Sequence, residues 1–301
     1  MTGQVFGVDI LGVLAQTQAT MAAALPDFLP AVGEVPTAIP AAMRQALAGG
    51  KRLRPFLTLR AAAACGLEPQ LVLPTACGIE MMHCANLVHD DLPCIDDADL
   101  RHGLTALHLA FGEATALLAA DALIIQSFEC LARQAECPAT PPDRVLQCLR
   151  ELAECTGPRG LIGGEALDIE AEHRPYTEAD LEFIHINKTA KLIIFATRAG
   201  AILAGADAAT LQTFTDYAEA LGLLFQITDD LLDATGTEAE MGKPVGADAA
   251  AGKATYPGLL GVEAARQRAE AVGARALAAA RGLPDSGMWL SLADFVVARR
   301  H

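Results

Sequence analysis

Apolar residues recur along most of the chain at intervals of three and four, the spacing that places them on one face of a helix. Gly and Pro interrupt this pattern, and no run alternates apolar and polar residues as a half-buried strand would. The pattern predicts helices over residues 5–24, 36–47, 52–65, 71–91, 113–133, 142–157, 177–203, 208–234, 257–281 and 286–299. No domain boundary is apparent, so we expect a single domain over residues 1–301.

The composition also favours helices. Hydrophobic residues make up 52% of the chain and aromatic residues only 5%, with abundant alanine, which is typical of closely packed helices rather than of a β-sandwich. The mean hydropathy is +0.31, but no uninterrupted apolar run approaches the ~20 residues that span a bilayer. The most apolar stretch, residues 116–125, contains Asp121. We therefore expect no transmembrane segment.

The charge balance limits the possible partners. A net charge of −15 argues against a nucleic-acid-binding protein, because that affinity comes from basic residues that neutralise phosphates. No Lys or Arg precedes Arg44, so the positive region of a secretory signal is not found and we expect a cytoplasmic protein. The eight cysteines form no CxxC pair, which supports neither a zinc site nor a disulfide framework.

Two acidic clusters of similar design end apolar predicted helices. The first contains Asp90, Asp91 and Asp96, and the second contains Asp229, Asp230 and Asp233. Adjacent carboxylates in apolar surroundings repel one another and are poorly solvated, so a cation must offset them. Mg²⁺ takes oxygen ligands and commonly completes its shell with substrate phosphates. The clusters therefore predict that the chain binds a metal-chelated phosphate ester.

The neighbours of the first cluster fit this interpretation. Pro93 stops or kinks the helix, so that Asp96 can curl back toward Asp90 and Asp91. His83 shares a helix face with Asp90. Residues 49–55, Gly-Gly-Lys-Arg-Leu-Arg-Pro, place backbone amides and three cations at a predicted helix start, which favours an anion. Each feature alone has a simpler explanation, a solvated acidic helix end or a basic helix cap.

Taken together, these motifs resemble those of the short-chain trans-isoprenyl diphosphate synthases. The resemblance covers nearly the whole chain and keeps the family's order and spacing. It rests on GGKRLRP at 49–55, HDDLPCIDDADLR at 89–101, FGE at 111–113, Lys188-Thr189, FQITDDLLD at 225–233, Gly242-Lys243 and Gly252-Lys253. It implies an all-α isoprenoid synthase fold, a single helix bundle around a central active-site cavity, and usually a homodimer.

The resemblance also implies roles for single residues. The six aspartates resemble the family's ligands of Mg²⁺, for which Mn²⁺ is a possible substitute. Gly50, Lys51, Arg52 and His83 are similar to the binding site for isopentenyl diphosphate. Arg101, Lys188 and Lys243 resemble the cations that hold the allylic diphosphate, and Lys253 adds to their field. Thr189 and Gln226 match polar residues near the developing carbocation.

Several positions depart from the family pattern. His102 stands where a second Arg normally helps to bind isopentenyl diphosphate, and histidine is a weaker, pH-dependent substitute. Ala98, Thr105, Ala106, Ala110 and Glu165 also replace residues that are more common in the family. All six aspartates are nevertheless present, so these departures point to an altered affinity or substrate.

Product length depends on the depth of the cavity below the first cluster. Ala85 lies five residues before Asp90, about 7 Å along a helix. Its small side chain leaves the bottom of the cavity open. By the resemblance, a small residue here favours geranylgeranyl diphosphate as the product, with farnesyl diphosphate as the alternative. Asn86 is unusual at its position for either product and could restrict the pocket again.

Two other classes of protein share parts of this pattern. A terpene cyclase or head-to-head synthase also binds metal ions through acidic clusters. It would not need residues 49–55 to bind isopentenyl diphosphate. A noncatalytic partner subunit would be expected to lose carboxylates from one cluster, and here both clusters are intact.

Overall fold

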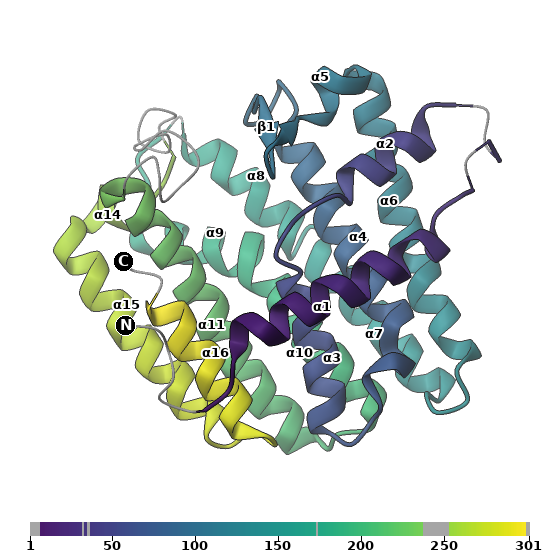
Figure 1. Cartoon of the computed structure of the whole chain (residues 1–301). Helices are drawn as coiled ribbons and strands as arrows, with labels where there is room; N and C mark the ends of the chain where they lie inside the picture. Colours follow the sequence, from purple (N-terminus) through teal and green to yellow (C-terminus); the bar gives the residue numbers. More distant parts are fainter. Residues whose placement is uncertain (1–6, 32, 35–36, 173, 237–252, 299–301) are drawn as a thin grey trace. The chain divides into compact units, whose positions relative to one another are not determined.

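The computed structural model describes residues 7–31, 33–34, 37–172, 174–236 and 253–298 (Figure 1). Its regular structure there is helical apart from one two-stranded hairpin, which confirms the all-α prediction. The chain divides into two compact units, one comprising Leu11–Leu149 and Ala199–Gly205 and the other Met1–Ile10, Arg150–Arg198 and Ala206–His301. The prediction of a single domain stays a prediction.

The first unit is built around two long apolar helices that pack along each other, α4 (Leu73–Asp90) and α6 (Glu113–Arg133). Around them lie α1 (Ile10–Ala24), α2 (Ile39–Ala46), α3 (Leu53–Ala64), α5 (Leu107–Phe111) and the 3₁₀ turns Leu25–Phe28, Pro69–Val72 and Gln134–Glu136. α4 is mostly buried because small residues such as Cys77, Gly78 and Ala85 let its neighbours approach closely. It ends at the first acidic cluster.

The hairpin was not predicted from the sequence, because its strands are too short to show alternation. β1 (Leu100–Arg101) pairs antiparallel with β2 (Leu104–Thr105). The two residues between the strands, His102 and Gly103, have φ values of 53° and 78°. Positive φ at both central residues is the backbone that a tight two-residue hairpin needs.

The second unit is organised by α11 (Ala208–Thr235), which packs against α15 (Val262–Ala280), α16 (Ser286–Ala298) and α14 (Tyr256–Leu260). The other face of α11 contacts the segment His185–Ala190, called η4, which is a π-helix between α9 (Glu178–Ile184) and α10 (Lys191–Ala204). η4 also packs on α8 (Leu161–Ala171). The chain changes unit at the start of α1, within α7 (Pro142–Thr156), within α10 and in the loop before α11.

Two predicted helices differ from the structure within their bounds, and two observed helices, α5 and α8, were not predicted. The predicted helix over 177–203 contains the π-helical segment η4, and the predicted helix over 257–281 is broken at Gly261, whose φ is 83°. α8 was not predicted, since Gly163 and Gly164 read as helix breakers. The fold needs Gly164, because an added Cβ would lie 2.5 Å from the backbone nitrogen of Lys188.

Two helical stretches, Pro69–Asp90 and Glu113–Glu136, are long and apolar enough to cross a membrane by length and composition. For the first, 67% of the apolar window is buried inside the protein, as expected of a core helix, whereas the value for the second is 39%. The expected absence of a transmembrane segment stays a prediction.

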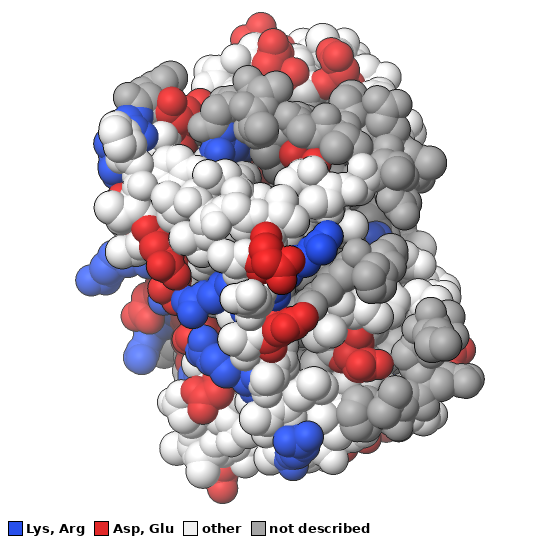
Figure 2. Space-filling model, turned by 90° about the vertical axis from the view of Figure 1, so that its left-hand side faces the viewer, with Lys and Arg blue, Asp and Glu red and all other residues white. Residues whose placement is uncertain are grey.

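On the face shown in Figure 2, Lys and Arg side chains are interspersed with Asp and Glu side chains, so neither positive nor negative charge dominates that face.

Candidate active site

In the first unit, residues 49–52 form a tight loop before α3. Gly49, Gly50 and Arg52 all have positive φ, between 55° and 81°. His102 packs directly on the two glycines, since Cβ atoms added there would lie 3.2 Å and 3.3 Å from its side chain. Lys51, which follows Gly50 in the loop, is exposed. Glycine is therefore favoured here for its backbone conformation, and a side chain at either position would make a tight contact with His102.

Arg52 is held by the protein itself. Its guanidinium lies 2.5 Å from Glu80 Oε1 and also donates to the Leu47 carbonyl, and the Arg52 and Glu80 side chains are 8% and 3% exposed. This buried pair fixes the end of the loop against α4. Whether Arg52 also binds a diphosphate stays a prediction, as does the role of Lys51.

The first acidic cluster closes on itself at the end of α4. The Asp96 N–H donates to the Asp90 carbonyl at 2.8 Å, so the backbone curls back after Pro93 as predicted. Asp91 is buried, and Arg101 from β1 donates to both of its carboxylate oxygens through Nε, at 3.0 Å and 3.2 Å. The hairpin thus places a predicted diphosphate-binding cation directly beside a predicted metal ligand.

Two histidines near this cluster carry no charge at neutral pH. Burial, followed by the charge of Arg54, holds the pKa of His83 well below its usual value. Partial desolvation and then the charge of Arg101 also lower the pKa of His102, although the residue as a whole is exposed. His102 therefore does not supply the positive charge of the arginine that usually occupies its position.

In the second unit, the predicted residue Lys188 lies between two carboxylates of α8. Its Nζ is 2.7 Å from Asp168 Oδ2 and 2.8 Å from Glu165 Oε2. Asp168 is largely buried. Glu165 is one of the departures from the family pattern, and it contributes to holding this lysine in place.

Thr189 and Gln226 lead to the second acidic cluster through hydrogen bonds. The Thr189 hydroxyl donates to Gln226 Oε1 at 2.9 Å, and Gln226 Nε2 donates to Asp230 Oδ1 at 3.0 Å. The other oxygen of Asp230 accepts the backbone N–H of Tyr256 at 3.1 Å. Asp230 and Asp233 are each 3% exposed, whereas Asp229 is half-buried. Lys253 is half-buried, and Lys243 lies outside the described residues.

The chemistry of these donors fits a hard divalent cation, because each cluster offers several carboxylates, of which Asp91, Asp230 and Asp233 are buried. Among the residues that the structure describes, no three His, Cys, Asp or Glu side chains come close enough to hold a metal ion by themselves. Mg²⁺ commonly shares its shell with water and substrate phosphates, so a protein need not enclose it. The six aspartates therefore stay predicted ligands.

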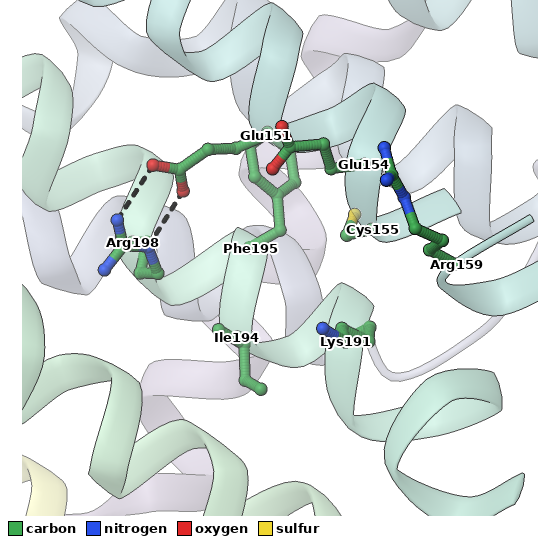
Figure 3. Close-up of a pocket in the computed structure, with 8 residues that line it drawn as sticks. All are labelled: Glu151, Glu154, Cys155, Arg159, Lys191, Ile194, Phe195 and Arg198. Carbon is green, nitrogen blue, oxygen red and sulfur yellow. Dashed lines mark hydrogen bonds and ion pairs between the residues drawn. The ribbon is translucent and has the colours of Figure 1, made fainter. Parts of the chain in front are cut away.

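A separate cavity of about 530 Å³ lies beside α10 and the end of α7 and contains none of the predicted site residues (Figure 3). Arg198 and Glu151 form an ion pair on one side of it, with Nη2 and Oε1 2.8 Å apart. Lys191 and Arg159 extend on different sides of the Cys155 thiol (Figure 3). The charged residues that line this cavity nearly balance, with two glutamates against two arginines and one lysine.

Sequence reasoning missed four residues that contact predicted site residues within their own unit: Glu80 in the first unit, and Asp168, His185 and Tyr256 in the second. Asp168 follows Glu165 by three residues, so their shared helix face was a usable signal. Glu80 and Tyr256 gave no such signal, because their partners are distant in the sequence. The sequence likewise gives no reason to assign a role to His185.

The profile of the polyprenyl synthetase family matches residues 36–281. The chain belongs to this family. This polyprenyl synthetase is 44% identical over 236 residues to a farnesyl diphosphate synthase from Geobacillus stearothermophilus, covering 78% of this chain and 79% of the relative. It is 40% identical over 260 residues to the chloroplastic geranylgeranyl pyrophosphate synthase 7 of Arabidopsis thaliana, covering 85% and 74%.

The solved structures agree with the sequence relatives. The crystal structure of a geranyltransferase from Helicobacter pylori, complexed with magnesium and isoprenyl diphosphate, matches with a TM-score of 0.82 and 27% identity over 97% of both chains. The predicted family, the isoprenoid synthase fold and the prenyltransferase class are thereby confirmed. The relatives include both farnesyl and geranylgeranyl synthases, so they do not decide the product.

Proposed function

We propose that this polyprenyl synthetase condenses isopentenyl diphosphate with an allylic diphosphate, either dimethylallyl, geranyl or farnesyl diphosphate. The observation that carries the proposal is that each acidic cluster ends a long helix beside its own cationic or polar partners, Arg101 for Asp91 and the Thr189–Gln226 pair for Asp230. The allylic C–O bond breaks and its electron pair leaves with pyrophosphate. The double bond of isopentenyl diphosphate then attacks the carbocation, and loss of a proton yields a product longer by five carbons.

The protein's own groups serve this reaction by position and charge. When bound, Mg²⁺ neutralises the diphosphate and stabilises the leaving pyrophosphate. The six aspartates would hold it, and Arg101, Lys188, Lys243 and Lys253 add positive charge around the allylic diphosphate. The Thr189 hydroxyl and the Gln226 amide present fixed dipoles to the developing carbocation. Pyrophosphate is the proton acceptor, so no side-chain base is needed.

The product that we favour is geranylgeranyl diphosphate. Ala85 is fully buried in α4, about 7 Å below Asp90, and offers no bulk to stop a growing chain. Farnesyl diphosphate is the second candidate, because the 44% identical Geobacillus relative is a farnesyl diphosphate synthase. The side chain of Asn86 is the group that could stop the growing prenyl chain earlier.

The deciding experiment is product analysis. Purified protein is incubated with Mg²⁺, radiolabelled isopentenyl diphosphate and each allylic primer in turn, and the dephosphorylated products are separated by chain length. A twenty-carbon product supports the open floor, and a fifteen-carbon product supports farnesyl diphosphate. Absence of any product would favour a noncatalytic partner subunit.

Ala85→Tyr should shorten the product by at least one isoprene unit. The phenol ring would occupy the space below the first cluster, where Ala85 has no side-chain bulk. The measurement is the same product analysis, with Ala85→Ser as the size-matched control. An unchanged chain length in Ala85→Tyr, with turnover retained, would contradict the position of the floor.

His102→Arg should lower the KM for isopentenyl diphosphate and leave the KM for the allylic primer unchanged. His102 is uncharged at neutral pH because partial desolvation and Arg101 lower its pKa. Wild-type protein gains this charge only as the pH falls below the usual histidine value of about 6.5, so the difference between the two proteins should shrink in acid. Equal KM values at every pH would show that residue 102 does not contact this substrate.

We further propose that the protein is a homodimer in which a second copy covers α6. Leu117, Leu118 and Ile125 of α6 are 45%, 57% and 71% exposed, an apolar surface typical of an interface. Light scattering should give twice the chain mass for the wild type and a smaller mass for Ile125→Glu.

The cytoplasm is the compartment that we propose. All eight cysteines are thiols rather than disulfides, and several are buried, as in proteins of reducing compartments. Cell fractionation with an antibody against the chain tests this.

A further inference from the structure

We propose that His185 is a positioning residue for the second acidic cluster and orients the carboxylate of Asp230 toward its ligand. His185 Nε2 lies 3.3 Å from Asp230 Oδ2, and the two side chains are 5% and 3% exposed. The contact does not meet hydrogen-bond geometry, and Nε2 is a buried nitrogen without a hydrogen-bond partner among the described residues. Asp230 is thus the polar group that this buried nitrogen faces. The proposal concerns metal binding and rests on the family's metal site described above.

The π-helix explains how His185 reaches α11. His185 and Thr189 are four residues apart on η4, and their partners Asp230 and Gln226 are four residues apart on α11. The two segments therefore run antiparallel where they meet, and the two contacts lie one turn apart on each. A π-helix inside an α-helical run is commonly found at functional sites, where it redirects side chains.

A close approach of the two segments makes these contacts possible. One turn before Gln226 on α11, an added Cβ at Gly222 would lie 2.7 Å from both Cα and Cβ of Ala190. Glycine is needed there so that η4 can lie directly against α11. The side chains of His185 and Thr189 are then within reach of the acidic helix.

The histidine ring is itself held in place. It stacks on Tyr256 with ring centroids 5.3 Å apart and an angle of 31° between the planes. The backbone N–H of the same Tyr256 donates to Asp230 Oδ2. Two residues from different segments therefore approach one carboxylate oxygen together.

The distribution of donors around Asp230 determines which oxygen is available. Oδ2 faces both Tyr256 N–H and His185 Nε2, whereas Oδ1 accepts one hydrogen bond, from Gln226. A carboxylate has about two lone-pair sites on each oxygen. We infer that His185 and Tyr256 occupy Oδ2 and leave Oδ1 with capacity for a cation.

The test is metal binding rather than turnover. Mn²⁺ is titrated into the full-length protein with inorganic pyrophosphate present, and free Mn²⁺ is followed by electron paramagnetic resonance. His185→Phe keeps a ring against Tyr256 but removes the nitrogen, and we expect its Kd for Mn²⁺ to rise about 10–100-fold. His185→Gln keeps an N–H donor and should recover most of the affinity. If His185→Phe does not fold, His185→Asn, whose donor is too short to reach Oδ2, replaces it.

Tyr217→Phe is the matched control for lost packing or hydrogen bonding in α11. It removes one buried hydrogen bond, from the Tyr217 hydroxyl to the Trp289 carbonyl at 2.9 Å, and should lower the melting temperature without changing the Kd for Mn²⁺. A folded His185→Phe protein with wild-type Mn²⁺ affinity would overturn the proposal, as would a His185→Gln protein that binds as weakly as His185→Phe. Wild-type binding that persists without any prenyl transfer would count against the proposed function alone.

Discussion

Asp90→Ala and Asp229→Ala are each expected to lower prenyl transfer by on the order of 10³-fold or more while the protein stays folded. Metal stabilisation of a departing phosphate group is worth several kcal/mol, and each 1.36 kcal/mol corresponds to about a factor of ten in rate. Asp90 is the last residue of α4, and Asp229 is half-buried in α11. Alanine favours helix at both positions, so the helices should form normally.

Turnover is measured with the product that the wild type makes, over a series of Mg²⁺ concentrations, and folding by circular dichroism. Asp216→Ala is the matched control, because Asp216 is an exposed aspartate on the same helix as Asp229 and accepts a hydrogen bond from Gln212 at 2.7 Å. It should retain wild-type turnover. Near-normal rates in Asp90→Ala or Asp229→Ala would refute the assignment of that cluster to the metal.

Glu80→Ala is expected to reduce the free energy of unfolding by about 3–5 kcal/mol, because it leaves the buried guanidinium of Arg52 without its carboxylate. Arg54 adds to the effect: burial lowers its pKa, and the charge of Glu80 opposes that shift. A typical protein is stable by only about 5–15 kcal/mol, so much of the total would be lost. The loop that carries Gly49 and Gly50 ends at Arg52 and should loosen as well.

Denaturant unfolding measures this loss. Glu80→Gln keeps an acceptor for Arg52 and should cost less, and Arg52→Met combined with Glu80→Leu should recover only part of the stability, because Arg54 still lacks its carboxylate. Glu219→Ala is the surface control: its pair with Arg275 spans 3.4 Å between half-exposed side chains, and such pairs contribute at most about 1 kcal/mol. Equal effects at Glu80 and Glu219 would mean that burial of the Arg52 pair has no energetic consequence.

Local patterns in the sequence were enough to predict most helices and the family. The period of three and four residues located α6 at residues 113–133, matching the structure at both ends, because a helix is fixed by residues close in the chain. The acidic clusters were equally visible, since adjacent aspartates in an apolar run need a cation wherever the segment lies. The curl after Pro93 followed from the missing backbone N–H of proline.

The interactions that hold the site required the tertiary structure. Glu80 meets Arg52, Asp168 meets Lys188, and Tyr256 meets Asp230 across 20 or more residues of sequence, and no local pattern records such pairs. The uncharged state of His102 was likewise not evident, because a pKa depends on burial and on neighbouring charges.

The sequence by itself thus determined the helical fold class, the family and the carboxylates on which its chemistry depends, because these follow from residue type and local spacing. Only the tertiary structure decided which groups position those carboxylates. The π-helix at His185–Ala190 and the contact of His185 with Asp230 arise from the close approach of two segments at Gly222. Such an approach depends on the packing of the whole unit rather than on any stretch of sequence.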